Sequence, residues 1–118
     1  MAVSVTYYIR GGPVTINGST TAPTAQQAAQ VQKQAAVIVW GTVDDTTALF
    51  THNWGLDASA PGYYEPEVLF EPISTGTTSW PLITFWRANT NVLVCGKRAG
   101  DKETTCLVTI RRPHSIGQ

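Results

Sequence analysis

The sequence predicts an all-β fold: an antiparallel β-sandwich or jelly-roll-like domain with about seven or eight short strands and at most one short helix. Short runs of apolar, β-branched and aromatic residues recur along the chain, separated by clusters of Gly, Pro, Asn and Asp. Of the 118 residues, 42% are hydrophobic and only 14% are charged, which suits a domain with a buried core. No internal repeat or linker interrupts the pattern, so residues 1–118 are predicted to form a single β-domain.

The first predicted strand covers residues 2–10, where apolar and polar side chains alternate as they do in a half-buried strand. A short returning strand at residues 14–16 precedes a predicted Asn17-Gly18 turn. The next signal is helical, because Thr24 starts a capping box that leads into good helix formers near residues 24–30.

The helical signal is weak and short, so residues 13–34 as a whole are open to two interpretations. The stretch is either an extended arm that lies on a neighbouring subunit or a surface loop of the same chain. Loops of this kind are common at the surface of compact domains.

Residues 35–41 and 46–52 are predicted to pair as a hairpin. Both runs are rich in the residue types that favour strands, and residues 43–45 between them supply a turn. With the turn centred there, His52 lies about opposite Val37.

The middle of the chain predicts two further strands. Residues 68–70 lie between Pro66 and Pro72, and proline cannot donate to a sheet ladder, so this strand is expected at an edge. Residues 80–86 form another predicted strand, followed by a turn at residues 87–90.

Residues 91–113 predict the central hairpin and hold both cysteines. If its turn is the two-residue Gly100-Asp101 type, Cys95 lies opposite Cys106. Apolar residues fall on both faces of this hairpin, so we expect the rest of the chain or another subunit to cover them.

The cysteine pair has two readings. Directly opposed cysteines come within disulfide range, and so short a loop would contribute about 2–3 kcal/mol. The N-terminus lacks the pattern of a secretory signal, which indicates synthesis in the cytosol. We therefore favour two buried free thiols at Cys95 and Cys106, unless the protein later meets an oxidising exterior.

The charge balance argues against two classes of partner. Eight basic and eight acidic side chains give a formal net charge of zero, so nothing predicts nucleic-acid binding or attachment to an anionic membrane. No apolar stretch approaches the length that spans a bilayer.

No catalytic residue, cofactor or metal site is predicted, and we expect a protein that is not an enzyme. The chain has no G-x-S-x-G motif, and its histidines and cysteines lack the short spacings of zinc ligands. A glycosidase pair could be drawn from Glu65, Glu67 and Glu71. Alternating acids beside prolines are more often the solvent face of an edge strand.

Aromatic residues raise a carbohydrate-binding alternative. Trp54, Trp80 and the pair Tyr63-Tyr64 lie at strand ends or in connections, where flat rings can stack on sugars. Trp40 and Trp86 lie inside apolar strands, so core or interface packing is the better interpretation for them.

Two short stretches resemble a known class of protein. These are Thr51-His52-Asn53-Trp54-Gly55-Leu56 and Arg111-Arg112-Pro113-His114-Ser115-Ile116. Together with the small β-rich frame, they resemble capsid decoration or cement proteins of tailed bacteriophages.

The resemblance implies a non-enzymatic virion protein on the capsid exterior, often a homotrimer, whose partners are the major capsid protein and itself. The two arginines suit docking on an acidic surface, although a solvated strand end is equally consistent with them. His52 is more readily explained as a satisfied structural histidine. The candidate partner-binding residues are His52, Asn53, Trp54, Arg111, Arg112 and His114. The alternatives are a tail or baseplate component and a carbohydrate-binding module.

Overall fold

The computed structural model describes residues 3–10, 12–41, 46–56, 66–75, 83–97 and 103–112. These residues contain eight strands and one short helix. In chain order they are β1 (Ser4–Ile9), β2 (Ile16–Ser19), α1 (Ala25–Ala28), β3 (Lys33–Trp40), β4 (Thr47–Thr51), β5 (Glu67–Thr75), β6 (Ile83–Asn89), β7 (Val92–Lys97) and β8 (Thr104–Arg111).

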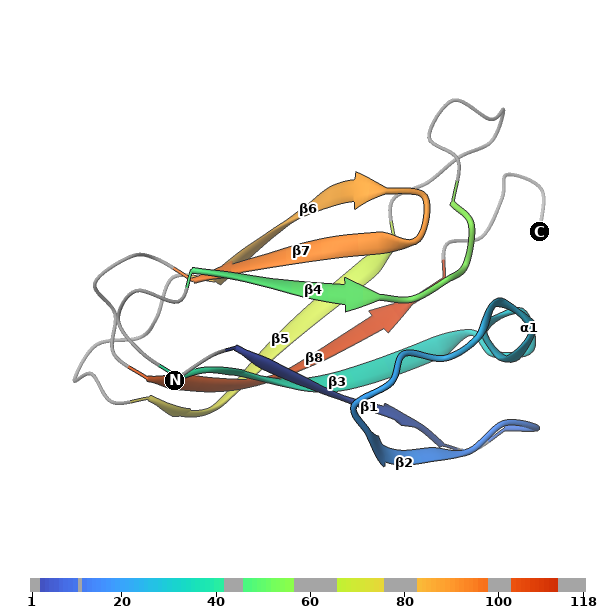
Figure 1. The fold of residues 1–118 in the computed structure, drawn as a ribbon, viewed down its shortest axis with the longest axis horizontal. Helices are drawn as coiled ribbons and strands as arrows, with labels where there is room; N and C mark the ends of the chain where they lie inside the picture. The colour runs from blue at the N-terminus through green and yellow to red at the C-terminus, as the bar shows by residue number, and fades with distance from the viewer. Residues whose placement is uncertain are drawn as a thin grey trace.

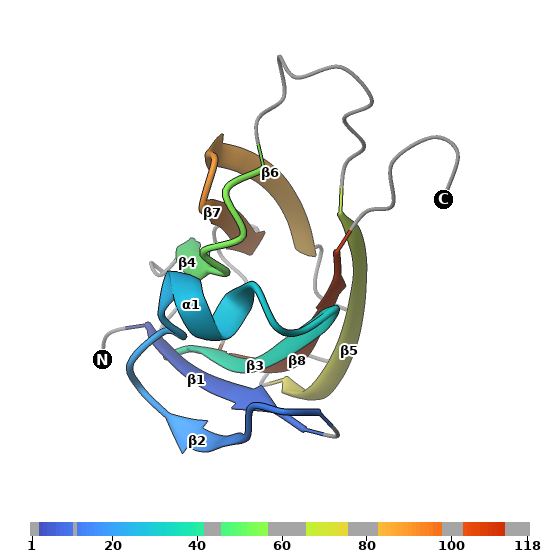
Figure 2. The same cartoon turned by 90° about the vertical axis from the view of Figure 1, so that its right-hand side faces the viewer.

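The strands form two antiparallel sheets that pack face to face (Figure 1). The five-stranded sheet has the order β2-β1-β3-β8-β5, and the three-stranded sheet has the order β4-β7-β6. Figure 2 looks along the sandwich, and the two views place α1 at one end of it, near the segment that follows β4. The predicted all-β sandwich is therefore confirmed.

From β3 onward the chain winds between the sheets. Strands β3, β5 and β8 belong to the five-stranded sheet, while β4, β6 and β7 belong to the other. Among the described strands, consecutive neighbours pair only as β1 with β2 and β6 with β7. This alternation is the winding of a jelly roll.

The predicted hairpin of residues 35–41 and 46–52 is wrong, because its two strands lie in different sheets. β3 pairs with β1 and β8, whereas β4 pairs with β7. Val37 consequently lies opposite Thr6, and His52 lies beyond the end of β4. A short polar connection can bridge two sheets as well as two neighbouring strands, and here it bridges the sheets.

The predicted hairpin within residues 91–113 is wrong for the same reason. β7 pairs with β4 and β6, while β8 pairs with β3 and β5. Cys95 lies opposite Ala48 and Cys106 lies opposite Ile38, so the cysteines are not cross-strand neighbours. Both face the space between the sheets, where the opposite sheet covers them.

The core lies between the two sheets and follows from strict alternation. Every second side chain of β3 and β8 is buried, and the residues between them are half-buried or exposed. Each large apolar side chain buried in this way contributes about 1.5–3 kcal/mol. The largest fully buried apolar side chains are Trp40, Phe50, Ile38, Leu93, Ile110 and Val108.

The N-terminal region confirms the first strand and the capping box. The Thr24 hydroxyl accepts from the Gln27 amide at 3.1 Å, and the Gln27 side chain accepts from the Thr24 amide at 2.9 Å. Asn17 and Gly18, predicted as a turn, lie within β2 instead. Within residues 13–34, β2 pairs with β1, and α1 buries Ala28 against the core of the same chain.

The edge position of β5 is confirmed, although the strand is longer than the sequence predicted. It lies at the end of the five-stranded sheet, and a register shift follows Pro72. Trp40 is in the core as predicted, but Trp86 is half-exposed on β6. Several predictions fall outside the described residues: the turns at 43–45 and Gly100-Asp101, and the residues Tyr63, Tyr64, Glu65, Trp80 and His114.

Candidate functional site

The segment after β4, which carries the first candidate motif, lies in the interior. His52 is only 1% exposed. Its Nδ1 accepts a hydrogen bond of 3.0 Å from the Trp54 backbone amide, and the two rings lie 5.3 Å apart. Burial, aided by the positive charge of Arg87, lowers the His52 pKa to about 4. This histidine is neutral near pH 7 and has a structural role.

The neighbours of His52 tie the same segment to distant parts of the chain. The Trp54 indole donates a 2.9 Å hydrogen bond to the Ala28 carbonyl at the end of α1. The Asn53 side chain donates to the Pro23 carbonyl at 2.6 Å, and its backbone has a φ of +57°. Both Trp54 and its hydrogen bond are buried, so this residue offers no ring for stacking on a sugar.

Arg111 and Arg112 lie at the end of β8 in different settings. The Arg111 side chain is exposed, and its Nε lies 3.8 Å from a carboxylate oxygen of Glu67. Arg112 donates its backbone amide to the Gln32 carbonyl at 2.8 Å and its guanidinium to the Ala29 carbonyl at 3.4 Å. Both candidate motifs thus contact the C-terminal end of α1, through Trp54 and Arg112. Of the two motifs, only the one with the arginines leaves polar side chains available to a partner.

Cys95 and Cys106 are free thiols buried in the core. Burial raises the pKa of Cys95 to about 12, with a further contribution from the nearby Cys106. Burial likewise raises the pKa of Cys106 to about 11. Neither thiol is a nucleophile at neutral pH, because the thiolate form is the reactive one.

The described residues bring together no candidate metal centre. Within them, no group of three or more His, Cys, Asp or Glu side chains comes together as a metal site would require. Glu67 and Glu71 lie exposed on the edge strand β5, as expected of a solvent-facing edge. Nor does any helix in the described ranges have the length and apolar character needed to cross a membrane.

The outer face of the three-stranded sheet is the first of two surfaces that remain as candidate binding sites. Leu49, Val94 and Trp86 form a row across β4, β7 and β6, in which the central Val94 is buried. Leu49 is 58% exposed and Trp86 is 48% exposed. The Trp86 ring covers Gly96, where an added Cβ would lie 2.9 Å from a ring carbon.

Alternation assigns only uncharged side chains to this outer face: Thr47, Leu49, Thr51, Thr84, Trp86, Val92, Val94 and Gly96. We call this surface the neutral face. Large apolar side chains exposed together on a sheet are typical of a surface that another molecule covers.

The outer face of the five-stranded sheet is the second surface, and its residues lie in rows that cross the strands. One row runs Tyr8, Ala35, Thr109 and Leu69; the next runs Thr6, Val37, Leu107 and Glu71; a third, at the end of the sheet, joins Lys33, Arg111 and Glu67. We call this surface the charged face.

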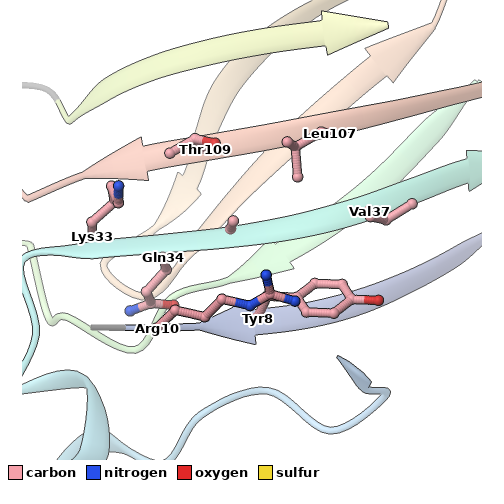
Figure 3. Close-up of a pocket in the computed structure, with 8 residues that line it drawn as sticks. Tyr8, Arg10, Lys33, Gln34, Val37, Leu107 and Thr109 are labelled. Carbon is pink, nitrogen blue, oxygen red and sulfur yellow. The ribbon is translucent and has the colours of Figure 1, made fainter. Parts of the chain in front are cut away.

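A hollow of about 400 Å³ lies on the charged face over Ala35. Figure 3 shows Tyr8 and Arg10 on one side of it, Leu107 and Thr109 on the other, and Lys33 at one end. The small Ala35 side chain between these larger ones leaves the space. A second hollow of about 220 Å³ lies between β3 and β5 and is lined by both acidic and basic side chains: Glu67, Glu71, Lys33 and Arg111, with Leu69 and Thr109.

Neither outer face could be recognised as a surface from the sequence. Each depends on which strands lie side by side, and the predicted hairpins gave the wrong neighbours. The local signal was present in the alternation of Glu67, Leu69 and Glu71, which the sequence alone explains as edge protection.

Comparison of the chain with models of protein families, with curated proteins and with solved structures finds no match. The structure itself defines the class of protein: an all-β sandwich with jelly-roll winding, whose two outer faces differ in charge.

Proposed function

We propose that the chain is a structural protein of a tailed-phage virion, which binds the outside of the capsid through the neutral face and stabilises the lattice without catalysis. The observation that carries the proposal is the row of Leu49, Val94 and Trp86, with two large side chains about half-exposed on a sheet that bears no outward charge.

Three further features support a binding role. The net charge of zero suits a protein on the capsid exterior that does not contact DNA. The buried state of His52 and of the thiols removes the obvious reactive groups from the described surface. A rigid sheet face also presents side chains at fixed spacing, which suits a repeating lattice that many copies occupy at once.

The resemblance that motivates the capsid assignment rests partly on the segment around His52 and Trp54. Its residues serve the interior, so in this proposal they position the end of β4 rather than contact the capsid. The exposed Arg111 remains available at the end of β8 for an acidic partner surface.

The test is a titration of capsids that were assembled without this chain, measuring both the bound amount and the temperature of DNA release. Saturable binding that raises the release temperature is expected. The double variant Leu49→Ser, Trp86→Ser should lose most of this binding. Leu69→Ser, which changes an equally exposed residue on the other sheet, should bind as the wild type does. The two proteins are compared at concentrations where their oligomeric states match.

Absence of binding to capsids rejects the proposal. Binding to isolated tails and not to tailless capsids would assign the chain to the tail or baseplate instead.

A further inference from the structure

We infer that the charged face binds a second copy of this chain, with Leu69 of each copy seated over the Ala35 hollow of the other. The inference does not depend on capsid binding, because it concerns the opposite sheet. Four observations on this face carry it: a hollow, an exposed apolar side chain of suitable size, and two separated groups of opposite charge.

The hollow and the apolar side chain lie on the same row. Ala35 on β3 and Leu69 on β5 both lie opposite Thr109 of β8, on either side of it. Leu69 is 55% exposed, so its side chain extends from the face toward solvent. The hollow of about 400 Å³ has the size of a small ligand pocket and readily admits a leucine side chain.

The charges divide across the face. Arg10 and Lys33 border the hollow on the β1–β3 side, and Glu67 and Glu71 flank Leu69 on β5. Arg10 is held in place by a 3.1 Å hydrogen bond to Asn17 and by its position 5.3 Å from the centre of the Tyr8 ring (Figure 3). The acidic and apolar strand β5 and the basic strand β3 thus lie on either side of β8.

The basic side has little internal compensation. Within the described residues, no ion pair joins Arg10 or Lys33 to a carboxylate. Lys33 lies directly opposite Arg111 on β8, and like charges in that position are destabilising. Arg111 forms an ion pair with Glu67 at 3.8 Å, but both side chains are exposed, so this pair contributes little to stability. A carboxylate from outside the chain would relieve this repulsion.

A two-fold axis parallel to β8 brings the two sides together. Such an axis exchanges the left and right sides of the face but keeps each residue at its own height along the strands. Leu69 of one copy then meets the row of Ala35 of the other, and Glu67 meets the row of Lys33. One symmetric interface makes the Leu69 and Glu67 contacts twice, once for each copy, as isologous contacts do. Because the axis runs over β8, it also brings the two exposed Arg111 side chains near each other, beside the Glu67 carboxylates. Sheets stacked face to face pack nearly aligned.

The edge of β5 favours association through the face. Pro72 lacks the amide needed to extend the ladder, and the register shift after it bends the strand. A copy that approached along the edge would meet this interruption, whereas Glu67, Leu69 and Glu71 remain presented on the outer face. The predicted assembly is therefore a dimer, unlike the trimer that the family resemblance implies.

The experiment measures the mass of the purified chain in solution by sedimentation, over a range of concentrations and without any capsid. A concentration-dependent dimer is expected, weakened by salt. Lys33→Glu and Glu67→Lys should each weaken association roughly tenfold, since every substitution acts twice in a two-fold interface. The double variant Lys33→Glu, Glu67→Lys should recover it.

Matched controls keep the result specific. Arg112→Glu and Glu103→Lys make the same charge changes outside the rows of the face and should leave the dimer intact. Ala35→Leu fills the hollow and should weaken association without changing any charge. Circular dichroism confirms that each variant is folded.

A wild-type chain that stays a monomer at the highest concentration overturns the inference, as does a trimer. So does a folded double variant that fails to recover association. None of these outcomes bears on capsid binding through the neutral face, so the two proposals can fail separately.

Discussion

His52 makes the stability of this fold depend on pH. Its ring is buried beside Trp54, and its Nδ1 must stay unprotonated to accept the Trp54 backbone amide at 3.0 Å. Protonation would remove that acceptor and place a second positive charge near Arg87. Burial and this charge lower the His52 pKa from 6.5 to about 4.

The direction and size of the effect follow from linkage. Above pH 6.5 the ring is neutral in both the folded and the unfolded chain, so the fold has its full stability. Below pH 6.5 the unfolded chain takes up the proton first, and stability falls until the folded pKa of about 4 is reached. At about 1.4 kcal/mol per pKa unit, the loss attributable to His52 approaches about 3 kcal/mol, or roughly 10–15 °C in Tm.

Urea unfolding at a series of pH values, for the wild type and for His52→Asn, measures this contribution. The Asn side-chain oxygen can replace Nδ1 as acceptor, but it does not titrate. We expect the wild type to lose more stability than the variant between pH 6.5 and 4, with the difference near 3 kcal/mol. Equal losses in the two proteins, or a His52 pKa near 6.5 by NMR, would refute the reasoning.

Three further predictions concern side-chain packing. Trp54→Phe removes the buried indole hydrogen bond to α1 and should cost about 1–3 kcal/mol in urea unfolding, whereas Trp86→Phe, a surface change, should cost much less; equal losses would contradict the buried role. Gly96→Ala should displace the Trp86 ring and shift its fluorescence to the red, while Gly12→Ala, where an added Cβ meets nothing within 4 Å, should not; unchanged fluorescence in both would argue against the contact. The two cysteines should resist alkylation at pH 8 in the folded chain and both react in urea, because burial raises their pKa values to about 12 and about 11; rapid labelling of the native protein would show that they are accessible.

The sequence was sufficient for the class of fold and for several of its elements. Period-two alternation located the strands around Tyr7 and Val108, because a strand with one buried face must repeat every second residue. The capping box at Thr24 was correct because its hydrogen bonds are local. Pro72 marked an edge strand because the missing amide constrains any sheet.

The pairing of strands could not be predicted from the same patterns. Alternation states which residues face inward, and in that respect Cys95 and Cys106 were both correctly assigned to a covered face. It does not state which strand lies alongside. A short polar connection suits a hairpin and also suits a crossing between sheets, and the jelly-roll winding uses the crossing at both predicted hairpins.

The candidate site suffered from the same limit. His52, Asn53 and Trp54 lie in a polar connection, which the sequence favours as surface. Their partners, among them Pro23 and the Ala28 carbonyl, are distant in the chain, so their burial becomes visible only in the fold. The neutral and charged faces likewise require residues from three or four strands to be brought into line.

The most direct test of the proposed function is hydroxyl-radical footprinting of the chain, free and bound to capsids, with oxidation measured residue by residue. If the neutral face binds the lattice, oxidation of Trp86 and Leu49 should fall strongly on binding, while oxidation of Leu69 on the other sheet should change little. Unchanged oxidation of Trp86 and Leu49 on saturated capsids would contradict the account.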